Sequence, residues 1–475
     1  VTQTVEVTGE APLVQTTEAA VGYLMDNRTI TELPLNGRDI SQLMLLNPGV
    51  TQNANGKWGN ADKGFGKRFS ISGMRGEDNS YLLDGSYIND YYRHVPAGPS
   101  GALTGIETVR EFQMLTNSFS AAYGRALGGV FNAVTKSGTN QWHGSAYEFL
   151  RNSKMDAANF FDNAQGTGKA PLKRNQFGAT FGGPVFRDKT FFFVAYEGLR
   201  ERLSQSSVAN VPGDDARRGI LPVVNSAGVV TGTRTVTVSP RIQPFLDMLP
   251  RPSPTGKTFP TVGTAEYYFV ASQPTGENFG QGRIDHQISD SDSLFGRFTG
   301  LNANRSTFRE LPDRFEVGNL QTRLFTLSET HIFSPTLLST FRFSYNRVLP
   351  ATDHAIPPAP PGTISVPSQP DMAAFESIQG VLTGLRNTEG PGTTYITHRF
   401  AFHDDINFTR GNHAMQLGGM IERLRYNPYQ PFRPYGEWRF PSLADFLQAD
   451  PDRIRGTPPE FGVFGRGFRQ TFIGL

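Results

Sequence analysis

The sequence predicts a mainly β protein: a small mixed α/β domain followed by part of an antiparallel transmembrane β-barrel, with about ten strands of an incomplete barrel. Three observations support this fold class. From Gly144 onward, apolar and polar residues alternate with a period of two, which is typical of strands. The connections between these strands alternate between short and long. The chain holds 37 Phe and 15 Tyr although only 37% of its residues are hydrophobic, which favours aromatic bands and a wet interior over a packed soluble core.

The alternation gives each predicted strand one apolar and one polar face. Along one strand the apolar face holds Leu337, Phe341, Phe343 and Tyr345, and the polar face holds Thr340, Arg342, Ser344 and Asn346. This pattern is expected where lipid lies outside and water inside a barrel. A soluble sandwich also alternates, so the alternation alone leaves both architectures open.

The lengths of the connections separate the two architectures. Strands are predicted at 144–150, 176–184, 191–199, 278–288, 294–302, 321–332, 337–347, 395–408, 413–425 and from 467 onward. Short connections are then expected at 185–190, 289–293, 334–336 and 409–412, and long ones at 151–175, 200–277, 303–320, 348–394 and 426–466. Short turns at one rim and long loops at the other indicate a barrel in the bacterial outer membrane, in contact with its lipid.

Composition excludes several classes of function. The 45 Lys and Arg residues nearly balance 43 Asp and Glu residues, so no nucleic-acid partner is expected. With 0 Cys, the chain has no disulfide, no thiolate zinc site and no cysteine nucleophile. No run of about 20 apolar residues predicts a transmembrane helix. Because Val1 to Thr4 begin neither a basic nor an apolar segment, we expect a fragment that lacks both natural ends.

Turn and cap signals order the first part of the chain. Asn36-Gly37 predicts a turn. Asp39 is placed to cap a helix over 40–46 that stops at Asn47-Pro48-Gly49.

Short strands with turns follow that helix. A strand from Phe69 to Ser72 leads into Arg75-Gly76, and Tyr81 to Leu83 lead into an Asp84-Gly85 turn. A β-branched run from Val130 to Thr135 reads as a strand between turns.

Several motifs near the end of this domain resemble a known family. They are I-E-x-V at 106–109, A-x-Y-G at 121–124, G-G-x-x-N-x-V-T-K-x-G-T-N at 128–140 and H-G-S at 143–145. In this order they resemble the end of the plug domain of TonB-dependent outer-membrane receptors and the entry to their barrel. The subtype resembles the Oar-like receptors, as does Leu-Pro-Leu-Asn-Gly-Arg at 33–38. Residues 115–119 stand where most such plugs carry an Arg-Gly-Pro turn, so substrates of iron–siderophore relatives are not carried over.

The resemblance implies a division of the chain and a set of motif residues. Residues 1–28 would be an N-terminal segment, 29–140 the plug domain, and 141–475 the N-terminal part of the barrel with long extracellular loops, truncated. The plug motif residues are Arg75, Gly76, Asp84, Gly85, Tyr123, Gly124, Gly128 and Gly129. An Asp and an Arg in a plug are expected to pair with each other or with the barrel wall.

A short β-prone stretch precedes the plug. It consists of Thr4, Val5, Glu6, Val7 and Thr8. Read alone, it is the last strand of a domain cut off upstream. Its resemblance to a TonB box implies that it pairs edge to edge with a strand of the periplasmic protein TonB.

The resemblance implies a transporter that binds substrate at its outer loops and plug apex and imports it by TonB-driven rearrangement of the plug. Tyr87, Tyr91, Tyr92 and His94 would face the substrate, or are ordinary amphipathic loop residues. An oligosaccharide, a peptide and a metal chelate all fit. We expect no enzyme, no catalytic residue and no cofactor. The alternatives are a non-transporting adhesin or structural barrel, and a secreted carbohydrate-binding β protein.

Other chemistries have weaker support. Gly166 to Lys169 faintly resemble a phosphate loop, but no Ser or Thr follows the Lys. Asp290 to Ser293 start like a calcium loop, but Leu294 breaks the ligand pattern, so a hairpin turn is expected. His403 and Asp405 fall on the predicted lumen face, where charged residues are normal. No metal site is predicted.

Overall fold

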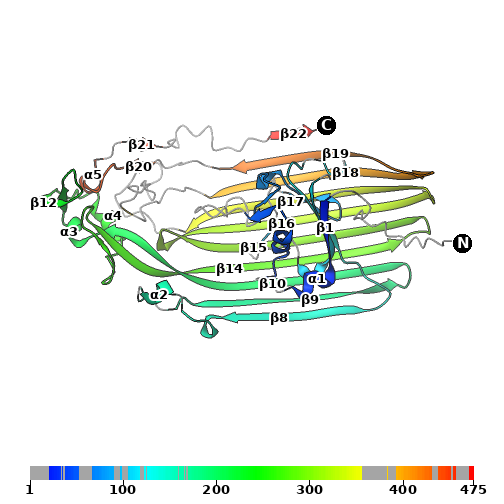
Figure 1. Ribbon diagram of the computed structural model, residues 1–475, viewed down its shortest axis with the longest axis horizontal. Helices are drawn as coiled ribbons and strands as arrows, with labels where there is room; N and C mark the ends of the chain where they lie inside the picture. The colour runs from blue at the N-terminus through cyan, green and yellow to red at the C-terminus, as the bar shows by residue number, and fades with distance from the viewer. Residues whose placement is uncertain are drawn as a thin grey trace.

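The computed structural model describes residues 21–33, 35, 38–52, 67–89, 97–98, 105–117, 122–124, 126–158, 160–164, 166, 169–355, 382, 392–430, 437–450, 453–455 and 470–474. Two sheets dominate it (Figure 1). We call the part built on strands β1 to β7 the N-terminal domain and the large sheet that begins at β8 the wall. The N-terminal domain lies across the middle of the wall (Figure 1).

The N-terminal domain is built on a five-stranded sheet in the order β1-β6-β7-β4-β5. Its strands are β1 Val21–Asp26, β6 Val109–Asn117, β7 Val130–Thr135, β4 Ser80–Leu83 and β5 Ser86–Tyr87. The β4–β7 pair is parallel and the other pairs are antiparallel. Around the sheet lie α1 Asn27–Glu32, η3 Gly76–Asp78, η4 Ile106–Thr108, and the separate pair of β2 Val50–Gln52 with β3 Phe69–Ile71. This arrangement confirms the small mixed domain.

The predicted helix near the start of this domain is present as a 3₁₀ helix, η1 Ile40–Leu46. The Asp39 side chain caps it by accepting a hydrogen bond from Ser41 N at 2.9 Å. Because Asn47 ends the helix, both of its predicted limits are confirmed. The helix buries Leu43 and Met44 in the core of the domain.

The wall is one continuous sheet in the order β22-β19-β18-β17-β16-β15-β14-β10-β9-β8, with β13 pairing beside β14. Its strands are β8 His143–Asn152, β9 Leu172–Phe186, β10 Thr190–Pro212, β13 Thr258–Phe259, β14 Thr264–Gln287, β15 Asp292–Arg309, β16 Leu311–Ser334, β17 Leu337–Ala355, β18 Thr393–Arg410, β19 His413–Tyr429 and β22 Gln470–Gly474. The fold class is therefore confirmed, each predicted strand is present, and the wall is not a pair of stacked sheets. Two predicted limits are wrong, because β10 runs to Pro212 and β14 starts at Thr264, both inside the predicted 200–277 connection.

The four predicted short turns are confirmed, and the connections at the other end of the wall are long except for the one between β15 and β16. Short turns follow β9, β14, β16 and β18, and the long connections gather at the opposite end of the wall (Figure 1). The long connections carry α2 Phe160–Ala164, α3 Asp214–Arg217, β11 Ile220–Val224, β12 Val230–Thr235, α4 Gln243–Met248, β20 Glu437–Arg439, α5 Leu443–Gln448 and β21 Arg453–Arg455. Phe245 and Leu246 of α4 share a buried apolar cluster with Phe446 and Leu447 of α5. No helix in the described ranges is long and apolar enough to span a membrane.

One predicted long connection is wrong. The stretch 303–320 is not a loop, because β15 runs to Arg309, β16 starts at Leu311, and only Glu310 with a φ of 63° lies between them. The apolar alternation weakens where Asn302 and Asn304 replace apolar residues, but the backbone pairing between the strands continues. Hydropathy therefore marked the end of the apolar face rather than the end of the strand.

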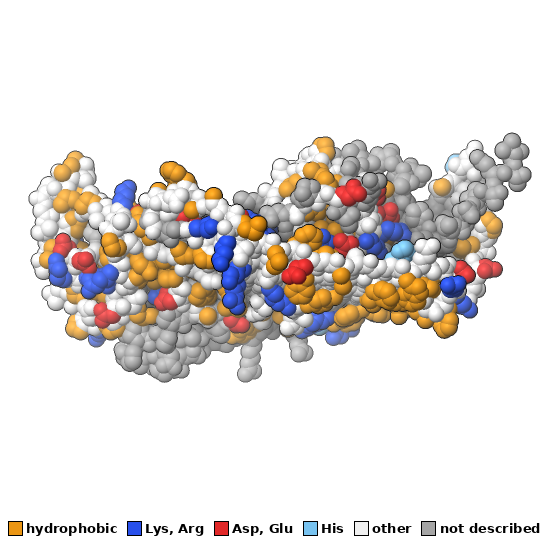
Figure 2. All heavy atoms as spheres, turned by 90° about the horizontal axis from the view of Figure 1, so that it is seen from below, with side chains coloured by type: hydrophobic (Ala, Val, Ile, Leu, Met, Phe, Trp, Pro, Cys, Tyr) orange, Lys and Arg blue, Asp and Glu red, His pale blue; other side chains and the backbone are white. Residues whose placement is uncertain are grey.

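The two faces of the wall differ as the alternation predicts. On β17, Arg342 and Ser344 are buried on the face toward the N-terminal domain, whereas Phe341 on the other face is 41% exposed. Rings of neighbouring strands touch on this outer face, with centroids 5.0 Å apart for Phe343 and Phe402. Hydrophobic side chains gather on the surface of the half of the wall nearer the short turns (Figure 2).

Candidate functional site

The β4–β5 turn of the N-terminal domain reaches the inner face of the wall. Asp84 and Gly85 form this two-residue turn, with φ values of 47° and 72°, and Leu83 pairs with Ser86 across it. Left-handed φ angles at both positions are what a tight hairpin of this kind requires. The predicted Asp-Gly turn is confirmed, and it buries the Asp84 side chain completely.

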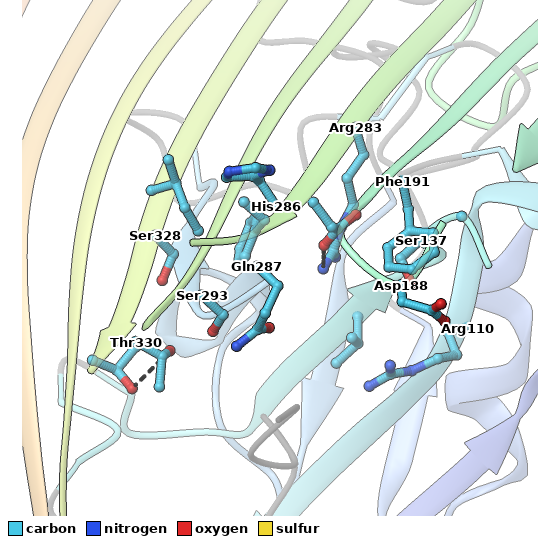
Figure 3. A pocket seen from close by; sticks show the side chains of 16 residues that line it. Arg110, Ser137, Asp188, Phe191, Arg283, His286, Gln287, Ser293, Ser328 and Thr330 are labelled. Carbon is cyan, nitrogen blue, oxygen red and sulfur yellow. Dashed lines mark hydrogen bonds and ion pairs between the residues drawn. The ribbon is translucent and has the colours of Figure 1, made fainter. Parts of the chain in front are cut away.

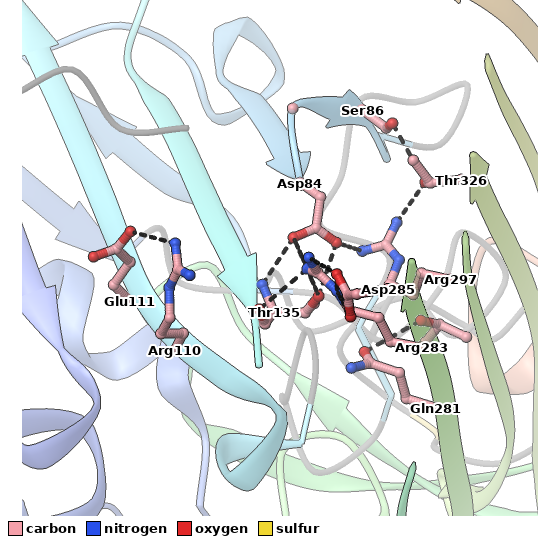
Figure 4. Close-up of polar contacts among 12 residues, drawn as sticks. Asp84, Ser86, Arg110, Glu111, Thr135, Gln281, Arg283, Asp285, Arg297 and Thr326 are labelled. Atoms are coloured by element: carbon pink, nitrogen blue, oxygen red, sulfur yellow. Dashed lines mark hydrogen bonds and ion pairs between the residues drawn. The ribbon is translucent and has the colours of Figure 1, made fainter. Parts of the chain in front are cut away.

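Two arginines of the wall hold the Asp84 carboxylate. Arg297 Nη1 of β15 lies 2.8 Å from Oδ2, and Arg283 Nη1 of β14 lies 3.5 Å from Oδ1. From β7, the backbone N of Thr135 donates to Oδ1 at 2.8 Å and its hydroxyl donates to Oδ2 at 3.0 Å (Figure 4). We call these four residues the Asp84 cluster. The sequence left open whether Asp84 pairs with an arginine of the plug or with the wall. In the structure, Asp84 pairs with the wall.

The Asp84 cluster favours the ionised carboxylate. Burial alone would raise the pKa of Asp84, but Arg297, Arg283 and the hydrogen bonds from Thr135 together hold this pKa below its usual value. Arg283 also pairs with Asp285 at 2.7 Å and lies over the Phe295 ring at 4.3 Å. Arg297 donates to Thr326 Oγ1 at 2.7 Å. Asp285, which lies outside the four residues of the cluster, therefore balances the second arginine charge.

A second arginine contact lies beside this cluster. The Arg342 guanidinium packs on Gly85, and its Nη1 is 3.5 Å from Gly85 O and 3.2 Å from His403 Nδ1. Asn346 donates to the Tyr87 carbonyl. Thr326 and Ser86 are also bonded, at 3.4 Å between their hydroxyl oxygens. Strands β16 and β17 thus reach the β4–β5 hairpin through polar groups, and His403 of β18 contacts Arg342.

A third contact joins the start of the N-terminal domain to the first wall strand. The Arg38 guanidinium lies 4.2 Å from the centre of the Tyr147 ring and pairs with Glu107 at 2.8 Å. The Tyr147 hydroxyl donates to Glu197 at 2.6 Å. These contacts link β8 and β10 to the N-terminal domain.

A cavity of about 340 Å³ separates the N-terminal domain from the wall on the side of the short turns (Figure 3). It is lined by Arg110, Val134, Ser137, Gly138, Asp188, Phe191, Arg283, Asp285, His286, Gln287, Ser293, Leu294, Phe295, Ser328, Thr330 and Thr340. Charged side chains of both signs and several hydroxyls line it together with the Phe191 and Phe295 side chains, so it presents both polar and apolar surface. Arg283 belongs to the Asp84 cluster and also lines the cavity, so movement of the cluster would change the shape of the cavity.

The other predicted motif residues lie outside this cluster. Arg75 is exposed and precedes η3. Gly128 and Gly129 are buried, and Gly129 N donates to Asn79 Oδ1 at 3.0 Å. Gly76 is also buried, at the start of η3.

Two predicted tyrosines lie near one another. Tyr123 packs against the buried cluster that contains Leu82 and Val130. The Tyr87 hydroxyl donates to Gly124 O at 2.8 Å.

Thr4, Val5, Glu6, Val7, Thr8, Tyr91, Tyr92 and His94 all lie outside the described residues. Conversely, sequence reasoning missed Arg283 and Arg297 as partners of Asp84. The only signal for them was an arginine on the polar face of a predicted strand, which does not identify a partner about 200 residues earlier in the chain.

Replacing Gly85 by Ala is expected to lower the free energy of unfolding of the N-terminal domain by about 2 kcal/mol. A Cβ there meets Arg342 Cζ and Nη1 at 2.8 Å, and the φ of +72° already disfavours a side chain. Urea unfolding in detergent micelles measures the loss. Gly73→Ala is the matched control, because Gly73 has a φ of +78° but nothing within 4 Å. Equal losses in the two variants would show that Arg342 does not restrict this position.

Two family models match the chain. One described as "Outer membrane beta barrel domain" matches residues 134–472, and one described as "TonB-dependent Receptor Plug Domain" matches residues 17–130. The TonB-dependent transporter Oar of Myxococcus xanthus is 30% identical over 220 residues, which cover 44% of this chain and 19% of that protein. The ferrienterobactin receptor of Escherichia coli K12 is 28% identical over 200 residues, which cover 40% of this chain and 24% of that protein.

Solved structures share the fold at low sequence identity. The outer membrane transporter YddB from Escherichia coli aligns with a TM-score of 0.53 and 12% identity, over 88% of this chain and 50% of that one. The siderophore receptor PirA from Acinetobacter baumannii aligns with a TM-score of 0.51 and 14% identity, over 87% of this chain and 49% of that one. The chain therefore spans about half the length of these structures.

Proposed function

The chain belongs to the outer membrane β-barrel domain family, as plug and partial barrel of a TonB-dependent receptor in the bacterial outer membrane, and on this premise we propose that the protein imports a substrate by TonB-driven movement of its plug. The N-terminal domain is the plug and the wall is part of the barrel. The observation that carries the proposal is the polar character of the contact between them.

Polar contacts dominate the interface between plug and wall. Asp84, Ser86 and Tyr87 of the plug meet the wall through ion pairs and hydrogen bonds. Among the described residues, Leu324 is the single wall side chain that joins the apolar core of the plug. Interfaces of this polar kind are typical of parts that move relative to each other, because water can replace the lost polar contacts. A plug that serves only as a permanent structural part would gain more from a shared apolar core.

The order of strands in the plug gives a route for force. The proposed TonB-binding stretch, Thr4 to Thr8, precedes β1, and β1 pairs with β6 at the edge of the plug sheet. Strand β6 pairs with β7, whose last residue, Thr135, bonds to Asp84. A pull on the N-terminal stretch would break the pairing of β1 with β6, and the force would then act on β7. Loss of the Thr135 contact would remove the hydrogen bonds that β7 donates to the Asp84 carboxylate. The cavity beside Arg283 would then enlarge.

The remaining assignments are part of the same proposal. We keep the boundaries 1–28, 29–140 and 141–475 for the N-terminal segment, plug and partial barrel. Tyr87, Tyr91, Tyr92 and His94 are proposed to face the substrate, for which an oligosaccharide, a peptide and a metal chelate remain the candidate classes. The role is binding and import rather than catalysis.

Deleting residues 4–8 from the full-length protein is expected to abolish energy-dependent uptake while leaving binding at the cell surface intact, because strand pairing with TonB supplies the force. The measurement follows accumulation of the substrate by whole cells, with and without an uncoupler of the membrane potential. Deletion of residues 11–15, which is equally long, is the control. Binding without uptake in the intact protein would favour an adhesin, and uptake that survives the 4–8 deletion would refute the TonB contact.

A further inference from the structure

Three side chains with metal-binding chemistry meet on the outer face of the wall, near the short turns. Asp292, Glu329 and His331 each place one ligand atom within 4.8 Å of those of the other two. We propose that these residues bind one divalent cation of the Zn²⁺ class. The site is separate from the Asp84 cluster, because it lies on the opposite face of the same strands.

Strand pairing places the three ligands together. Asp292 on β15 is directly opposite His331 on β16, and Glu329 lies two residues earlier on the same face of β16. Ser328 and Thr330, which alternate with them, line the inner cavity instead. Ile332 N donates to Ser291 O at 2.8 Å, so the backbone under the site is held on both strands. A site on paired strands is more rigid than a site on a loop.

Neighbouring groups orient the ligands. The His331 ring packs edge to face against Phe333, with centroids 4.2 Å apart, and its Nδ1 faces the Asp292 carboxylate. The other oxygen of Asp292 accepts a hydrogen bond from Ser289 Oγ. Carboxylates that bind metals are commonly held in this way by a second group. The side chains of His331 and Asp292 are 34% and 29% exposed, and Asp292 is the first residue of β15, so the site lies at the rim of the wall beside the short turn.

The charge around the site favours a cation. Two carboxylates lie within 4.8 Å of each other, and among the described residues neither Asp292 nor Glu329 forms an ion pair with Lys or Arg. Like charges at this distance repel each other. A divalent cation between the two carboxylates would relieve this repulsion, with the imidazole as its third ligand. Asp290 on the adjacent turn adds a further negative charge.

The ligand set selects the class of ion. An imidazole with two carboxylates suits Zn²⁺, which binds nitrogen at about 2.0 Å and carboxylate oxygen at about 2.1 Å. Neighbouring ligands of a tetrahedral zinc are about 3.3 Å apart, so an ion would replace the direct contact between His331 and Asp292 and draw the three ligand atoms, now within 4.8 Å of one another, around itself. Mg²⁺ and Ca²⁺ prefer oxygen ligands alone, so the imidazole disfavours them. Three protein ligands leave a fourth position for water.

The test is zinc binding by the full-length protein in detergent micelles, measured by competition with a fluorescent zinc chelator. His331→Gln and Glu329→Gln are each expected to weaken binding of Zn²⁺ at this site by at least about 10-fold. Zn²⁺ should also raise the Tm of the unchanged protein, and this increase should be smaller in both variants. Since both side chains are partly exposed, these substitutions leave the fold intact, and circular dichroism verifies this.

His413→Gln is the matched control, because His413 is exposed at another short turn of the wall and is not one of the three clustered residues. Its substitution is expected to leave zinc binding unchanged. The proposal is overturned if His331→Gln binds zinc as tightly as the unchanged protein, or if His413→Gln causes the same loss. Failure of the proposed transport function would not affect either measurement, because binding is measured without uptake.

Discussion

Replacing Asp84 by Asn is expected to lower the free energy for opening of the plug by about 3–5 kcal/mol, because it leaves Arg297 fully buried without a carboxylate. Arg283 retains Asp285, so the loss falls mainly on Arg297. Native-state hydrogen exchange of β4 and β7 amides measures this opening directly, since these two strands hold Asp84 and Thr135. We expect exchange in both strands to accelerate together.

Two further variants make this result specific. Asp247→Asn removes an exposed carboxylate of α4 that accepts a hydrogen bond from Gln243 of the same helix, and it is expected to change the opening free energy by less than about 0.5 kcal/mol. The double variant Asp84→Asn with Arg297→Met removes both charges and keeps at position 84 a side chain that tolerates the left-handed backbone and can accept from Thr135 N, so it should recover part of the stability lost in Asp84→Asn. A loss below about 1 kcal/mol in Asp84→Asn would mean that the buried ion pair does not hold the plug.

Acidification should remove the stabilising contribution of Asp84 to the closed plug. Because the folded state holds the pKa of Asp84 below its usual value, the stabilising contribution of Asp84 is fully present above the unfolded pKa of about 3.9 and is lost as the pH falls through the folded value. The opening free energy of the unchanged plug should therefore lose this contribution only below about pH 4, and Asp84→Asn should lack this acid-dependent step. Near neutral pH the cluster stays ionised, so opening requires work from outside the plug.

Most of the fold follows from local signals in the sequence. Alternation along 337–347 identified both faces of β17, and Asp39 with Asn47 marked both ends of η1. The Asp84-Gly85 dipeptide identified its own turn, because few residues tolerate the left-handed backbone there. These features are local, so a single sequence is sufficient to predict them.

The partners across the interface do not follow from local signals. Arg297 looked like any charged residue on the polar face of a strand, and its pairing with Asp84 depends on where the plug rests against the wall. His331 and Asp292 are adjacent only because of the register between β15 and β16, which hydropathy does not fix to the residue. The alternation also did not predict that β15 continues past Asn302, because the backbone pairing extends further along the strand than the apolar pattern does. Contacts that depend on register or docking require the structure.

Replacing Gly138 by Ala is expected to displace the connection between the plug and β8 and to lower the stability of the plug–wall assembly by about 3 kcal/mol. A Cβ at this position meets the Phe192 carbonyl oxygen, and it lies 2.9 Å from both Phe192 N and Gly183 O. All of these atoms are backbone atoms of one cross-strand pair between β9 and β10, so no side chain can rotate away to make room. The connection must move instead, together with Thr135 at the end of β7.

The predicted consequence is coupled loosening of two regions. Hydrogen exchange should accelerate in β7, through Thr135, and also around the β9–β10 pair, whereas Gly85→Ala should leave the β9–β10 pair unchanged. Gly124→Ala is the matched control, because nothing lies within 4 Å of a Cβ at Gly124. If Gly138→Ala matched Gly124→Ala in both regions, the contact of Gly138 with the wall would not constrain the plug. A change confined to β9 and β10 would mean instead that the substitution displaces the wall strands and leaves the plug in place. The contact of Gly138 with the wall would then be independent of the Asp84 cluster.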